Sequence, residues 1–230
     1  MTQNTSPLIR LKDVSYIAES KTILSDIHAT VNYGEFVAIT GPNGGGKTTL
    51  LRIILKLIAP SRGTVEYFGT DGRIADRLYV GYLPQKNMID SHFPITVEEV
   101  IESGLLPLKG MSKQDRAERI EAVLDEVQLS SRRLQTIGTL SGGQLQRALL
   151  GRAIVSQPSV LILDEPLSYI DKQFESRLYE ILADYARHST ILLVSHEMSV
   201  IAGMATRHLI VDHTLHECTA HQHYIPSPCR

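Results

Sequence analysis

The feature that most constrains the fold of this chain is the sequence GPNGGGKT at residues 41–48. It matches G-x-x-x-x-G-K-[ST], in which glycines turn backbone N–H groups toward phosphate oxygens and the following helix contributes a positive N-terminus. A short apolar run, residues 35–40, precedes the loop, and residues 48–57 have a helical pattern. This order of strand, glycine loop and helix predicts a phosphate-binding site in an α/β fold.

The loop predicts a set of ATP contacts. We expect the Lys47 ammonium to reach the β- and γ-phosphates and the Thr48 hydroxyl to be a ligand of Mg²⁺. The predicted nucleotide-binding residues of this loop are Gly41, Pro42, Asn43, Gly44, Gly45, Gly46, Lys47, Thr48 and Thr49.

Other apolar runs alternate with helical patterns, which indicates a mostly parallel sheet covered on both faces. The further strands expected in this sheet are residues 79–83, 160–164 and 190–195. A small antiparallel sheet is expected from residues 8–14, 22–31 and 63–68. Residues 86–150 interrupt the alternation and are predicted to form a helical subdomain within a single domain, residues 1–230.

Helix starts are also predicted inside the helical segment. Thr96 with Glu99, and Ser112 with Asp115, have the spacing of a hydroxyl cap followed by a carboxylate. After Ser112, one apolar helix face is expected from Ala117, Ile120, Val123 or Leu124, and Val127.

Polar side chains follow three of the buried strands. Asp164 ends the run VLILD, and a carboxylate at the carboxyl end of such a strand is expected to bind Mg²⁺. Glu165 comes next and points elsewhere, so it is placed to polarise the water that attacks the γ-phosphate. His196 follows TILLVS and can hold the γ-phosphate, while Gln85 follows YVGYL and can touch both Mg²⁺ and water.

A second glycine loop, TLSGGQLQRA, occupies residues 139–148. Ser141 and Gln144 are spaced as a capping box, which predicts that Ser141 caps a helix through residues 145–154. A glycine-rich helix N-terminus presents N–H groups and positive dipole to an anion. The loop therefore predicts a second phosphate contact.

These residues resemble the ATP-binding subunit of ABC transporters over nearly the whole chain. Residues 140–144, LSGGQ, are similar to the ABC signature, which other P-loop NTPases lack. The resemblance implies that residues 41–49 are the Walker A loop and residues 160–164 the Walker B strand. By the same resemblance, Glu165 is the catalytic carboxylate and Gln85 the Q-loop glutamine. Asp171 is then the D-loop aspartate and His196 the switch histidine.

The resemblance also implies assembly. Two copies are expected to pair head to tail and trap two ATP molecules, each held by the Walker A loop of one copy. The residues expected to contact the ATP of the other copy are Ser141, Gly142, Gly143, Gln144 and Asp171. One position departs from the family: Ala18 stands where an aromatic residue usually stacks on adenine, which leaves Tyr16, two residues away, as the stacking candidate.

Two stretches bear on the transported substrate. Residues 86–97, KNMIDSHFPITV, resemble zinc, manganese and iron uptake ATPases. Five of the nine histidines and both cysteines lie near the C-terminus, which suggests either a zinc site or a polar tail on a terminal strand. These residues are His208, His213, His216, Cys218, His221, His223 and Cys229.

We therefore expect an ATP-hydrolysing, energy-coupling subunit of a metal-ion ABC importer, with ATP and Mg²⁺ as cofactors. The alternatives are an iron-chelate or vitamin importer and an exporter. A non-transport ABC ATPase of the DNA-repair type is less consistent with the motif spacing, and a P-loop kinase would not need residues 141–144. A net charge of −2 does not favour nucleic acid, and we find no signal peptide or long apolar run. Separate permease subunits, and indirectly an extracytoplasmic binding protein, are the expected partners of a cytoplasmic protein held at the inner membrane face.

Overall fold

The strands form two sheets in the computed structural model, which describes residues 6–85, 94–196 and 201–218. The larger sheet has the strand order β10-β9-β3-β8-β7-β6. Its strands are β3 (Phe36–Thr40), β6 (Val80–Leu83), β7 (Val160–Asp164), β8 (Thr190–Val194), β9 (Arg207–Asp212) and β10 (Thr214–Cys218). All neighbouring pairs are parallel except β9 and β10, which form an antiparallel hairpin at one edge.

The smaller sheet is antiparallel, with the order β2-β1-β4-β5. Its strands are β1 (Pro7–Ala18), β2 (Lys21–Asn32), β4 (Arg62–Phe68) and β5 (Ile74–Ala75). The first two strands are longer than predicted because irregularities let the pairing continue. Asp13 and Asp26 have φ angles of 53° and 52° and lie at shifts in the β1–β2 register.

The two faces of the larger sheet pack into different cores. Along β3, Phe36 and Ala38 join the core that contains α2 to α5, whereas Val37 and Ile39 join the core beneath α1 and the smaller sheet. Every residue of β7 and β8 is buried, which is why both strands have continuous apolar sequences. The predicted parallel sheet with a small antiparallel sheet is therefore confirmed.

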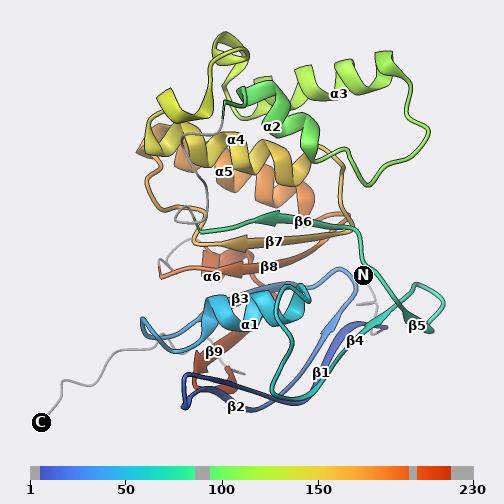
Figure 1. The fold of residues 1–230 in the computed structure, drawn as a ribbon, viewed down its shortest axis with the longest axis vertical. Coiled ribbons are helices and arrows are strands. Elements are labelled where there is room, and N and C mark those ends of the chain that lie inside the picture. Colours follow the sequence, from blue (N-terminus) through green and yellow to red (C-terminus); the bar gives the residue numbers. More distant parts are fainter. Residues whose placement is uncertain (1–5, 86–93, 197–200, 219–230) are drawn as a thin grey trace, which may run out of the picture.

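Helices lie mainly at one end of the molecule and the smaller sheet at the other (Figure 1). The helices are α1 (Lys47–Ile54), α2 (Val97–Ser103), α3 (Lys113–Glu126), α4 (Gly142–Ile154), α5 (Lys172–Tyr185) and the short α6 (Ile201–Met204). Two 3₁₀ turns, Ser130–Arg132 and Ile137–Thr139, connect α3 to α4. Helix α4 continues past residue 150 to Ile154 and packs beside β6. The predicted end of the helical subdomain at residue 150 thus falls inside a helix, and this boundary stays a prediction.

The predicted helix caps are present. Thr96 and Ser141 form capping boxes at the starts of α2 and α4, and Ser112 accepts a hydrogen bond from the Asp115 N–H at the start of α3. The prediction that Ala117 lies on the buried face of α3 is wrong, because Ala117 is exposed and the buried face of this helix begins at Ile120. Helix α1 ends at Ile54, before the predicted residue 57, and the left-handed Lys56 (φ 55°) prevents its continuation.

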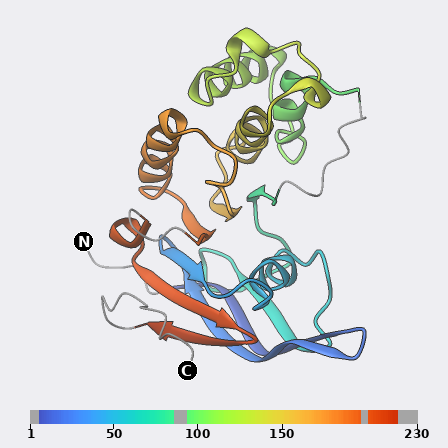
Figure 2. The same cartoon turned by 90° about the vertical axis from the view of Figure 1, so that its left-hand side faces the viewer.

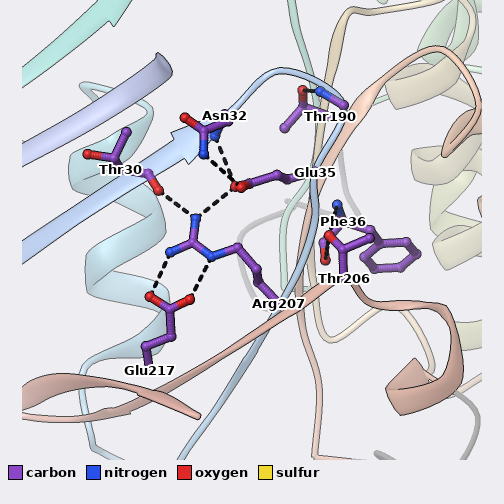
Figure 3. A network of polar contacts seen from close by, with 9 residues as sticks. Thr30, Asn32, Glu35, Phe36, Thr190, Thr206, Arg207 and Glu217 are labelled. Carbon is purple, nitrogen blue, oxygen red and sulfur yellow. Dashed lines mark hydrogen bonds and ion pairs between the residues drawn. The ribbon is translucent and has the colours of Figure 1, made fainter. Parts of the chain in front are cut away.

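An arginine network ties the start of β3 to the hairpin of β9 and β10 (Figure 3). Arg207 Nη1 donates to Thr30 O at 2.6 Å and to Glu35 Oε2 at 2.8 Å. Its Nε and Nη2 donate to the two oxygens of Glu217 at 2.8 and 2.9 Å. Glu35 also accepts from the Asn32 N–H at 2.9 Å. These contacts hold β3, and so the loop that follows it, against the hairpin.

None of the helices within the described ranges combines the length and the apolar character needed to span a membrane.

Candidate active site

The predicted functional residues follow four neighbouring parallel strands. The strands β3, β8, β7 and β6 lie side by side in that order, as an end-on view of the sheet also illustrates (Figure 2). The glycine loop follows β3, His196 follows β8, Asp164 and Glu165 stand at the end of β7, and Gln85 follows β6. Because parallel strands end at the same edge, groups from distant parts of the sequence meet there.

The glycine loop wraps around the Lys47 side chain. Lys47 Nζ donates to the carbonyl oxygens of Gly41 and Pro42, both at 2.9 Å. Gly41, Gly44 and Gly46 have φ angles of 140°, 81° and 99°, a range that disfavours other residues. Burial lowers the Lys47 pKa, while the nearby carboxylates of Glu165 and Asp164 oppose this shift. The ammonium is thus held over the loop.

Asp164 is a fully buried carboxylate at the end of β7. No hydrogen bond of ordinary geometry reaches either of its oxygens from the described residues. Burial raises its pKa, and the nearby Thr48 hydroxyl and Lys47 ammonium partly offset the shift. A buried carboxylate without a partner, beside a hydroxyl, is a donor set that fits a hard cation such as Mg²⁺.

Glu165 has a left-handed backbone, with φ 54°. Its N–H donates to Val194 O on β8, and its side chain is only 13% exposed. His196 Nε2 lies 3.1 Å from Glu165 Oε1. Burial raises the pKa of Glu165, and His196 opposes the shift. Left-handed conformations of such residues cost free energy and are concentrated at functional sites, so this backbone supports the predicted catalytic role.

Sequence analysis missed Gln146. It lies on α4, is 1% exposed, and its Nε2 donates to Glu165 O at 3.4 Å. Its Oε1 has no hydrogen-bond partner among the described residues. A polar residue two positions after Gln144 on the same helix was the available signal. Gln146 connects the helix of the second glycine loop to the backbone of Glu165.

The second glycine loop packs against the segment that follows β7. A Cβ added at Gly143 would lie 2.7 Å from Tyr169 O, so only glycine fits this approach. Asp171 caps α5 by accepting from the Phe174 N–H at 2.9 Å. The Arg147 guanidinium of α4 pairs with Asp171 and lies 4.2 Å from the centre of the Phe174 ring. Residues 141–147 and 169–174 therefore form one connected unit.

Two predicted residues lie at the margins of this site. Gln85 is exposed just after β6, and the predicted metal-uptake segment that follows it lies largely outside the described residues. Tyr16 pairs with Leu24 and packs against the core of the smaller sheet. Its ring is thus partly committed to packing, and its stacking on adenine stays a prediction.

Of the C-terminal histidines and cysteines that the structure describes, His208 and Cys218 are cross-strand partners, but no three of them bring metal-ligand atoms close together. His208 lies on β9, His213 at the turn, and His216 and Cys218 on β10. The other predicted ligands, His221, His223 and Cys229, lie outside the described residues. Within the described ranges, the only group of three residues with metal-ligand atoms close together is Asp13, Asp26 and His28, on the smaller sheet.

Comparisons with known proteins agree with this geometry. A family model described as ABC transporter matches residues 24–168. The zinc uptake system ATP-binding protein ZurA of Listeria innocua is 37% identical, over 95% of this chain and 89% of the relative. The zinc import ATP-binding protein ZnuC of Haemophilus influenzae is 34% identical, over 95% and 76% respectively. A probable metal transport system ATP-binding protein of Chlamydia trachomatis is 37% identical, over 84% and 82%.

Solved structures show the same fold. A bacterial ABC transporter cassette, solved as a dimer, has a TM-score of 0.80 and 25% identity and covers 93% of this chain and all of its own. A dimeric ATP-binding cassette in a post-hydrolysis state, bound to ADP and Pi, has a TM-score of 0.79 and 24% identity, over 92% of this chain and 98% of its own.

Proposed function

Because this chain belongs to the ABC transporter family, we propose that it is the ATP-hydrolysing, energy-coupling subunit of a metal-ion importer. The observation that supports this proposal most directly is the arrangement at the sheet edge. The glycine loop, Asp164, Glu165 and His196 stand at the ends of three adjacent strands, which puts a phosphate loop, a candidate Mg²⁺ ligand and a candidate base at one sheet edge. Relatives named for zinc uptake, zinc import and metal transport support a metal ion, with zinc first, as the substrate.

The glycine loop is proposed to bind the phosphates of ATP. Lys47 donates to two loop carbonyls, and the γ-phosphate would compete for these donors because a charged acceptor forms stronger hydrogen bonds than a neutral one. Thr48, Gln85 and Asp164 would hold Mg²⁺. When bound, this ion supplies positive charge that neutralises the phosphate oxygens.

Glu165 is proposed as the base that accepts a proton from the attacking water. Its backbone is fixed by Val194 O and Gln146 Nε2, and its carboxylate lies beside His196. His196 would orient this carboxylate and contact the γ-phosphate. The two side chains come from neighbouring strands, so their separation is set by the rigid sheet.

The second glycine loop is proposed to bind the ATP held by another copy of the chain. The capped N-terminus of α4 presents N–H groups beside Ser141, which suits an anionic phosphate. The active form would then be a head-to-tail dimer in which ATP joins the two copies. Membrane permease subunits, which would hold this chain at the inner membrane face, and an extracytoplasmic binding protein complete the proposed transporter.

Metal uptake by cells that depend on this protein tests the proposal. Cells carrying Lys47→Ala should lose accumulation of one metal among zinc, manganese and iron, and excess of that metal should restore growth. Lys113→Ala removes an exposed lysine at the start of α3 and is the matched control. Unchanged accumulation of all three metals with Lys47→Ala would overturn metal import while leaving the ATPase assignment intact.

A further inference from the structure

A single residue reverses the chain between β9 and β10. Asp212 and Thr214 pair with each other across the hairpin, and His213 between them has a left-handed φ of 55°. Histidine is among the residues that tolerate this conformation better than most, although glycine adopts it without strain. Because glycine would form this turn without strain, the turn alone does not explain why a histidine occupies position 213.

His213 makes three hydrogen bonds to other parts of the chain. Its N–H donates to Gly45 O in the glycine loop at 2.9 Å, and its carbonyl oxygen accepts from the Ser25 N–H on β2 at 2.7 Å. Its ring Nδ1 lies 3.1 Å from Ile23 O, also on β2. Because a carbonyl oxygen can only accept, Nδ1 is the donor in this contact. The residue thus connects the glycine loop to the smaller sheet.

The contact with Gly45 fixes one peptide of the phosphate loop. In a planar trans peptide, the carbonyl of one residue and the N–H of the next point in opposite directions. Holding Gly45 O against the hairpin therefore turns the N–H of Gly46 away from it. The Gly45 N–H is already bonded to Pro42 O at 3.1 Å, so the residue is held at both ends.

The hairpin also limits where this part of the loop can move. A Cβ at Gly45 would lie 2.7 Å from Val211 O, and one at Gly41 would overlap the same carbonyl. The loop is consequently packed on β9, and His213 supplies the hydrogen bond that sets its rotation. Gly46 is the N-cap of α1, so its N–H belongs to the positive helix start that faces an anion.

We propose that His213 is a positioning residue for nucleotide binding: its ring fastens the β9–β10 turn to β2, and its backbone orients the Gly45–Gly46 peptide toward the phosphates of ATP. The inference rests on the role of the glycine loop in ATP binding and does not depend on the transported substrate. It gives His213 a function other than metal ligation.

Substitutions can separate the ring from the backbone. His213→Gly keeps the left-handed turn and the N–H while removing the ring. In the full chain, this variant should bind ADP about 3- to 10-fold more weakly in calorimetry, which corresponds to the loss of one net hydrogen bond. The KM for ATP should rise by the same factor, with kcat at saturating ATP unchanged within about two-fold. His213→Asn, which retains a side-chain donor and tolerates the turn, should recover part of the affinity.

Gln128→Gly is the matched control. Gln128 is exposed at the end of α3 with φ 57°, so the same change acts on a similar backbone far along the chain from the loop. It should leave ADP affinity unchanged. Wild-type ADP affinity in His213→Gly, or an equal loss in Gln128→Gly, would overturn the proposal. If His213→Gly weakens ADP binding as expected but cells that depend on the wild-type chain import no metal, the proposed function alone is overturned.

Discussion

His196 Nε2 lies 3.1 Å from Glu165 Oε1, although the two residues follow different strands. Their strands, β8 and β7, are paired neighbours, and the Glu165 N–H is itself bonded to Val194 O two residues before His196. The pairing of β7 with β8 thus places the buried Glu165 carboxylate next to the His196 imidazole. This relationship allows the roles of the two side chains to be tested separately.

Glu165→Gln should bind ATP but lose hydrolysis. The amide keeps the size of the side chain and cannot accept the proton of water, so the rate of phosphate release should fall about 10²- to 10⁴-fold. The variant should accumulate as an ATP-dependent dimer in size-exclusion chromatography. Glu121→Gln, an exposed change on α3, is the control. An unchanged hydrolysis rate in Glu165→Gln would refute its role as the base.

The pH dependence of hydrolysis should show the raised pKa of Glu165. Burial raises this pKa, and a base must be deprotonated, so kcat should rise with pH through a value above the ordinary range of a glutamate. His196 opposes this rise in the Glu165 pKa. In His196→Gln, the residual kcat should therefore begin to rise with pH at a higher pH than in the wild type. If the rise of kcat with pH moves to lower pH in His196→Gln, the interaction described between Glu165 and His196 is contradicted.

Asp164→Asn should stabilise the nucleotide-free chain while abolishing hydrolysis. A buried polar group without a partner costs about 1–3 kcal/mol and a charged one costs more, so the neutral amide should remove the part of the cost that comes from charge. Because the folded-state pKa of Asp164 is raised, this penalty is present above that pKa and disappears as pH falls below the unfolded value. Denaturant unfolding at pH 7 and at pH 4 should show a gain that shrinks in acid. A gain that grows in acid would contradict the assignment.

Gly143→Ala should impair hydrolysis without weakening ADP binding to a single copy. The new Cβ would lie 2.7 Å from Tyr169 O, so the second glycine loop must move away from the segment it packs on. The glycine loop at residues 41–48 is untouched. Gly203→Ala is the control, because a Cβ there meets nothing within 4 Å. Steady-state ATPase should fall by about 10-fold or more, as expected when phosphate contacts are displaced. An unaffected rate would argue against a role for this loop.

The parts of the structure that could be predicted from sequence are those with local causes. The glycine loop stands between a buried strand and a helix, and Ser141 and Gln144 form their capping box within one turn. The bulges at Asp13 and Asp26 could not be predicted, because both aspartates adopt a conformation that pairing with other strands imposes. The Arg207 network joins residues up to 177 positions apart, and no local pattern signals it.

The same distinction applies to the candidate site. Asp164, Glu165 and His196 each follow an apolar run, so sequence could place them at strand ends. Gln146 was missed because its burial depends on how α4 packs over the end of β7. The roles assigned to these residues remain predictions that the variants above can test.

The position of β3 has a consequence for how the chain folds as it is synthesised. Both of its partners, β8 and β9, begin at Thr190 or later, more than 140 residues after β3 ends at Thr40. The phosphate loop therefore leaves the ribosome long before the strands that fix its starting strand exist. Contacts so distant in sequence form slowly, and an unpaired apolar strand is prone to aggregation. Stabilisation of this central strand by bound ATP would therefore have to wait until β8 and β9 have been synthesised.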